Sequence, residues 1–137
     1  MVNANEDLAR SEMEAALRGD FEAMVDHYAD DVVLHYPGRN QLSGTYRGKD
    51  GIRGWAAKID ELLGEGGSFT RSLHDIVAGD DHAVQLVSVD ARTGDGRAAN
   101  WNAAAVMHVR EGKISAIWLH IDDPYAVDEL FGGAAPA

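Results

Sequence analysis

The sequence predicts an α+β fold in which N-terminal helices pack on one face of a curved antiparallel sheet. Two observations lead to this prediction. Apolar residues recur at helical spacing in the first half of the chain, whereas the second half holds long strand-like runs separated by the turn sequences GDD, GDG and EGK. Helices followed by a strand meander are typical of an α+β domain. A curved sheet closed by helices leaves a cone-shaped cavity, where small-molecule sites tend to form.

The first segment predicts a helix over Glu6–Arg18, because apolar residues such as Leu8 and Met13 recur there at helical spacing. Asn5 is a suitable N-cap residue, and Gly19 is expected to end the helix.

Two further helices are expected before the long strands. Asp20 is expected to cap a short helix whose apolar side includes Tyr28. Asp50 is expected to cap a third helix that carries Trp55 on an apolar stripe and ends at Gly64. Both aromatic side chains are interpreted as core residues that could also contact a ligand.

The strands follow from β-rich runs bounded by turn residues. The first is expected at Val32–Tyr36, followed by a loop over residues 38–44 and a brief strand at Thr45–Arg47. Four longer strands are expected at Ser68–Ala78, His82–Thr93, Ala98–Arg110 and Lys113–Asp122. Because short turns separate them, these four should form an antiparallel meander. A last helical turn is expected at Pro124–Phe131, and a loose tail is expected over residues 132–137.

Composition limits the possible functions. A length of 137 residues predicts a single domain that is large enough for a hydrophobic core. With 12 Lys and Arg against 23 Asp and Glu, the net charge of −11 disfavours nucleic acid and anionic membranes as partners. The chain has no cysteine, and no apolar run approaches the roughly 20 residues of a membrane span. The polar, acidic N-terminus does not resemble a secretion signal, so a cytoplasmic location is expected.

The first strand carries the most suggestive chemical groups. His35 and Tyr36 stand at its end, directly before a Pro-Gly turn. An imidazole with a pKa of about 6.5 can act as an acid or base near neutrality, and a phenol can donate a hydrogen bond. Because side chains alternate along a strand, at most one of the two should line the cone directly.

The last strand offers a second candidate catalytic pair. His120 and Asp122 share one face of it with Trp118, and a histidine beside a carboxylate is the pattern of an oriented base. That face could instead be the convex one. His74, in the third strand, is a candidate hydrogen-bond partner for a ligand.

The fifth strand adds candidate ligand contacts. Asn100 and Asn102 flank Trp101, and amides in an apolar strand need partners. Small residues on the face of Trp101 leave room for a flat ligand. The sequence has no His-x-His, no HExxH and no glycine-rich phosphate loop, so neither a metal nor a cofactor is expected.

The segments GDFEAMVDHYADDVVLHYPG, YRGKDGI and HVREGKISAIW, in this order of elements, resemble the SnoaL-like group of the nuclear transport factor 2-like, or cystatin-like, superfamily. The resemblance covers residues 5 to 131. It implies a cystatin-like α+β cone, a homodimer and an apolar small-molecule ligand. The superfamily includes ketosteroid isomerases, limonene epoxide hydrolases, scytalone dehydratases and polyketide cyclases, and the fold alone does not decide among them.

The residues of the isomerase relatives are largely replaced here. Their carboxylate base before the proline corresponds to Tyr36, and their tyrosine donor in the first helix corresponds to Glu12. The region of their protonated aspartate holds Ala103, Ala104 and Ala105. The steroid-isomerase mechanism with its usual residues is therefore not expected.

The cyclase relatives match the last hairpin better, but they also lose residues. Their catalytic aspartate after a tryptophan corresponds to Leu119, while Asp122 retains a second acid. Their histidine and glutamine fall on Ala105 and Ala103. Asp90, Arg92 and Asp122 could supply the Asp-Arg-Asp arrangement of the epoxide hydrolases, but their spacing does not require it.

The leading interpretation is a cofactor-independent enzyme that carries out cyclisation, isomerisation or dehydration on an apolar, carbonyl-bearing substrate of polyketide or terpenoid type. His35 would be its acid or base. The alternatives are a non-catalytic binding module that uses the same cone, and a scaffold domain whose cone is filled.

Overall fold

The fold is described from a computed structural model, which describes residues 3–132. The predicted looseness of residues 133–137 lies outside this range. The helices are α1 (Ala4–Leu17), α2 (Phe21–Val25), α3 (Gly48–Leu63) and α4 (Pro124–Phe131). The strands are β1 (Tyr28–Tyr36), β2 (Gly44–Arg47), β3 (Ser68–Ala78), β4 (His82–Arg92), β5 (Ala98–Arg110) and β6 (Lys113–Ile121).

In the described residues, six strands form one curved sheet in the order β2-β1-β6-β5-β4-β3. The predicted meander of β3, β4, β5 and β6 is confirmed, and every neighbouring pair in it is antiparallel. Strand β1 instead runs parallel to β6, so the sheet is mixed and not wholly antiparallel as expected. The predicted α+β architecture, with helices packed on a curved sheet, is confirmed.

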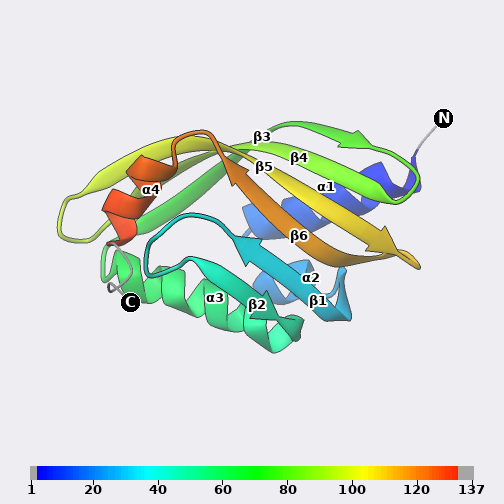
Figure 1. Cartoon of the computed structure of the whole chain (residues 1–137), viewed down its shortest axis with the longest axis horizontal. Helices are drawn as coiled ribbons and strands as arrows, with labels where there is room; N and C mark the ends of the chain where they lie inside the picture. The colour runs from blue at the N-terminus through cyan, green and yellow to red at the C-terminus, as the bar shows by residue number, and fades with distance from the viewer. Residues whose placement is uncertain (1–2, 133–137) are drawn as a thin grey trace.

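The helices of residues 3–132 all cover the same face of the sheet. Helix α1 packs on β3 and β4, α3 packs on β1 and β2, and α4 contacts β5 at one end of the sheet (Figure 1). The side chains between the helices and the sheet form the core, from Val25 and Ile52 near one end to Phe131 at the other. Within residues 3–132, no helix is both long and apolar enough to cross a membrane.

Three local expectations need correction. The N-cap of α1 is Asn3, whose side-chain oxygen accepts from the backbone N–H groups of Asn5 and Glu6, so Asn5 lies inside the helix. Helix α3 begins at Gly48, and Asp50 therefore lies in its first turn and does not cap it. Strand β1 begins at Tyr28, four residues before the expected start.

Candidate functional site

The concave face of the sheet and the helices above it enclose an apolar cavity. The centre of a water molecule can reach about 60 Å³ of space inside it. Its floor includes Ala103, Ala105 and Leu119 from β5 and β6, the two strands at the middle of the sheet. Its roof includes Met13 and Met24, whose flexible side chains let the space adapt to a ligand. In this conformation the cavity suits a small, flat molecule.

A buried carboxylate stands at one end of this cavity. Glu12 is 4% exposed and lies on the apolar stripe of α1. Its Oε2 accepts a hydrogen bond of 2.5 Å from the Tyr28 hydroxyl, and its Oε1 accepts one of 2.8 Å from Nε2 of Gln85. Gln85 also donates to the carbonyl of Ala9. These bonds offset the cost of burying the carboxylate and hold it in one orientation.

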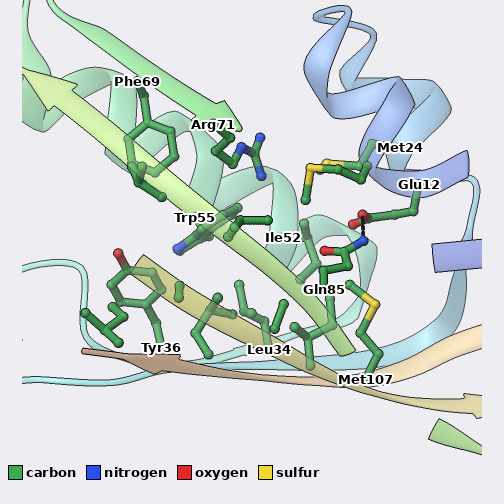
Figure 2. Close-up of a pocket in the computed structure, with 18 of the residues that line it drawn as sticks. Glu12, Met24, Leu34, Tyr36, Ile52, Trp55, Phe69, Arg71, Gln85 and Met107 are labelled. Carbon is green, nitrogen blue, oxygen red and sulfur yellow. Dashed lines mark hydrogen bonds between the residues drawn. The ribbon is translucent and has the colours of Figure 1, made fainter. Parts of the chain in front are cut away.

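Two hydrogen-bond donors face the other end of the cavity. Figure 2 shows Glu12 and Gln85 at one end and Tyr36 at the other, with Trp55 beside it. The rings of Tyr36 and Trp55 lie 6.0 Å apart between centroids. The Nε1–H group of Trp55 is buried, and no hydrogen-bond partner for it is found in residues 3–132. A buried donor without a partner indicates a place for a ligand acceptor.

Burial keeps both cavity tyrosines protonated. Burial is the main cause of the raised pKa of Tyr36. Burial is also the main cause of the raised pKa of Tyr28, and the negative charge of the neighbouring Glu12 carboxylate raises that pKa further. Each phenol therefore remains a hydrogen-bond donor well above neutral pH.

Removing the Tyr36 hydroxyl should make the protein more resistant to alkali. Its folded pKa lies above the unfolded value of about 10, so the folded state keeps the phenol proton longer than the unfolded state does. The stability from the neutral phenol is complete below about pH 10 and is lost as the pH rises further. Between about pH 8 and about pH 11, Tyr36→Phe should therefore lose less free energy of unfolding in urea than the wild type loses.

The control for this measurement is Tyr125→Phe, which removes a hydroxyl from a side chain that is 82% exposed. It should show the same alkaline loss as the wild type. Equal losses in Tyr36→Phe and the wild type would contradict the prediction.

His35, the predicted acid or base of the first strand, lies outside the cavity. Strand alternation turns Tyr36 inward and His35 to the convex face of the sheet. There the imidazole of His35 stacks on the indole of Trp118, with centroids 5.5 Å apart and planes 11° apart. Neither ring lines the cavity.

A series of hydrogen bonds that passes through Ser88 joins three more predicted residues, His74, Asn102 and Asp122, across the convex face. Nε2 of His74 lies 2.6 Å from Oγ of Ser88, which donates to the Asn102 side chain at 2.7 Å. The backbone N–H and the side chain of Asn102 both donate to Asp122 and lower the pKa of that carboxyl. These hydrogen bonds link β3, β4 and β5 to the end of β6. The bonded residues line a shallow groove on the convex face, and His120 lines it as well.

The predicted site residues thus divide between the two faces. The cavity is lined by Tyr28, Tyr36, Trp55, Trp101 and Leu119. The convex face carries His35, His74, Asn100, Asn102, Trp118, His120 and Asp122. Among the described residues, no group of three or more Asp, Glu and His side chains is arranged to hold a metal ion. Homodimerisation stays a prediction of the family resemblance.

Three polar residues of the cavity were not predicted as site residues. Glu12, Arg71 and Gln85 all line it. Each one occupies the apolar phase of its element: Glu12 on the buried stripe of α1, and the other two on the inward faces of their strands. A polar residue in the apolar phase of an amphipathic pattern is the signal that could have identified them.

Known proteins share this architecture along nearly the whole chain. The uncharacterized protein Rv0034 of Mycobacterium tuberculosis is 27% identical over 129 residues, which are 94% of this chain and 97% of that protein. The structure of Bal32a, from a soil-derived mobile gene cassette, superposes with a TM-score of 0.86 at 22% identity, covering 94% of this chain and 97% of that one. The structure of TerC co-crystallized with polyporic acid gives 0.82 at 20% identity, with 94% and 98% covered.

The family comparison agrees with the fold. Residues 9–117, well over half of the chain, match the family model of the SnoaL-like domain. Together with the curved sheet and the enclosed cone, this match establishes that the chain belongs to the SnoaL-like domain family.

Proposed function

We propose that this protein is a small-molecule enzyme of the cyclase or isomerase type, which transfers protons on a conjugated carbonyl compound. The observation that carries the proposal is the buried Glu12 carboxylate, which faces an apolar cavity whose far end presents the Tyr36 hydroxyl and the unpaired Nε1–H of Trp55. A desolvated carboxylate is a suitable general base, and donors aimed at an oxygen stabilise the charge that develops there.

The proposed step uses both ends of the cavity. Glu12 takes a proton from an acidic carbon of the substrate, and the released electron pair moves through the conjugated system to the carbonyl oxygen. The resulting enolate oxygen accepts hydrogen bonds from the Tyr36 hydroxyl and from Nε1–H of Trp55. Glu12 then returns the proton to a different carbon, which completes an isomerisation, or to the oxygen formed when the enolate carbon closes a ring on a second carbonyl.

The hydrogen bonds around Glu12 suit this role. Tyr28 and Gln85 each occupy one carboxylate oxygen, so the group is held in place while further lone pairs remain available to accept a proton. The conjugated substrate follows from the separation of Glu12 from Tyr36, because charge formed at one end must reach the other (Figure 2). TerC, a structural neighbour, was co-crystallized with polyporic acid, which supports a small organic ligand for this cone.

Proton exchange with solvent tests the proposal without knowledge of the natural substrate. A panel of small conjugated ketones is incubated in heavy water with the protein, and deuterium incorporation at carbon is followed by NMR. Wild-type protein should accelerate exchange for at least one compound. Tyr36→Phe should lower that rate about 10²-fold, because one donor to the enolate oxygen is lost.

Tyr125→Phe removes an exposed hydroxyl and should exchange at the wild-type rate. Absence of exchange with every compound, or an unchanged rate in Tyr36→Phe, would contradict the proposal.

A binding module is the second candidate function. Leu119 stands where the cyclase relatives are expected to carry an aspartate, and it lines the cavity floor. Retention of a panel compound with no deuterium incorporation after long incubation would favour this function over catalysis.

A further inference from the structure

Arg71 stands at the rim of the cavity. It lies on the inward face of β3, alternates there with Phe69 and Leu73, and is partly buried. Its side chain lines both the enclosed cavity and an outer groove between α2, α3 and β3. Figure 2 shows it between Phe69 and Met24, on the side opposite Leu34. A ligand that enters from the outer groove passes this guanidinium.

The guanidinium of Arg71 has no acidic partner within residues 3–132: none of their carboxylates lies within ion-pairing distance of it. The guanidinium instead lies over the face of the Phe69 ring, with its Cζ atom 5.7 Å from the ring centroid. Arg53 lines the same outer groove but is bonded by both Glu22 and Asp50. In a chain with 23 acidic and 12 basic residues, an unneutralised cation at the cavity rim is a feature that needs an explanation.

The charge of Arg71 acts inside the cavity. The pKa of Tyr28 and of Tyr36 is raised chiefly by burial, and the positive charge of Arg71 opposes that rise at both residues. The same cavity presents the unpaired Nε1–H of Trp55. Arg71, Tyr36 and Trp55 therefore form a set of donors that calls for a ligand rich in acceptor oxygens.

We propose that Arg71 binds a carboxylate of the ligand, so that the substrates of this protein are small planar organic acids. The proposal rests on the proposed function only in that it concerns the same cavity. The planar fork of a guanidinium fits a carboxylate through two parallel hydrogen bonds. Stacking on Phe69 fixes the plane of that fork.

A carboxylate fits this place better than a phosphate. Arg71 is the one basic residue among the described residues that line the enclosed cavity, and the outer groove also contains the acidic Glu22 and Asp60. A phosphate carries up to two negative charges, and Arg53, the other cation of the outer groove, is already paired with Glu22 and Asp50. The cavity, in which the centre of a water molecule reaches only about 60 Å³, also favours a single flat ring with a short acidic arm.

The experiment compares two probes of the same shape and different charge, trans-cinnamate and trans-cinnamamide, by titration calorimetry at neutral pH. Wild-type protein should bind cinnamate on the order of 10- to 100-fold more tightly than the amide. Arg71→Met should remove that preference, and Arg71→Lys should keep part of it. Arg92→Met is the matched control, because it removes the same charge from the convex face and should retain the full preference.

Equal binding of the two probes by the wild type, survival of the preference in Arg71→Met, or no binding of either probe would each overturn the proposal. Glu12→Gln should keep the preference for cinnamate. Binding with the expected preference but without proton exchange would therefore contradict the catalytic proposal and leave the acid site standing.

Discussion

Replacing Glu12 by glutamine should lower the rate of carbon proton exchange by about 10²- to 10⁴-fold, the usual contribution of a general base. The amide has nearly the shape of the carboxylate but cannot accept a proton at neutral pH. The Tyr28 hydroxyl can still donate to the amide oxygen, so the side chain should stay near its present position. The rate is measured by deuterium incorporation into the compound that the wild type exchanges fastest.

Glu14→Gln is the matched control, because Glu14 lies on the exposed side of the same helix. It makes the same change in net charge and should exchange at the wild-type rate. Thermal unfolding of both variants shows whether the fold is retained, since Glu12→Gln places an amide group opposite the Nε2 donor of Gln85. A folded Glu12→Gln protein with wild-type exchange would show that Glu12 is not the base.

The strands of the second half were predictable because local sequence determines them. Their turns are short, and their β-rich runs begin and end at turn residues, so the expected bounds differ from the structure by at most one residue. Helix ends were less predictable. Asn3 and Asn5 are both good capping residues. In the structure Asn3 caps the helix, while the Asn5 side chain donates to the backbone carbonyls of Gly79 and Asp80.

The pairing of β1 with β6 could not be inferred from local patterns. Val33 lies beside Ala116, 83 positions later in the chain, and no turn sequence links the two strands. Parallel pairing requires a long connection, and the whole meander supplies it here. Which strands become neighbours is decided when the helices close over the sheet, and that is a property of the entire fold.

The site was only partly predictable for a related reason. Alternation showed that His35 and Tyr36 point to opposite faces, but a single strand does not reveal which of its faces the helices cover. The bulge between Leu73 and Asp75 leaves His74 as the extra residue of β3, a feature that its sequence does not announce. The sequence shows Glu12 where isomerase relatives carry a tyrosine. It does not show that Tyr28 and Gln85 hydrogen-bond this carboxylate, which is what allows it to be buried beside the cavity.

Gly94→Ala should destabilise the protein by about 3 kcal/mol or more, the upper range for forcing atoms into a packed site. Gly94 begins the β4–β5 turn, and its N–H donates to the carbonyl of Leu63 at the end of α3. A Cβ atom on Gly94 would meet the carbonyl oxygen of Glu65 at far less than contact distance. The obstacle is backbone, so either the turn or the α3–β3 loop must move, and the 2.8 Å bond to Leu63 is lost with it.

Gly54→Ala is the control for this substitution, because Gly54 lies on the exposed side of α3 and a Cβ there meets nothing within 4 Å. It should stabilise the protein by about 0.5–1 kcal/mol, since alanine is the better helix former. Urea unfolding measures both changes, and equal slopes among the proteins are needed to compare them. Because α3 carries Trp55 into the cavity, Gly94→Ala should also weaken cinnamate binding in the protein that remains folded. A Gly94→Ala protein at least as stable as the wild type would show that the end of α3 is not held by this contact.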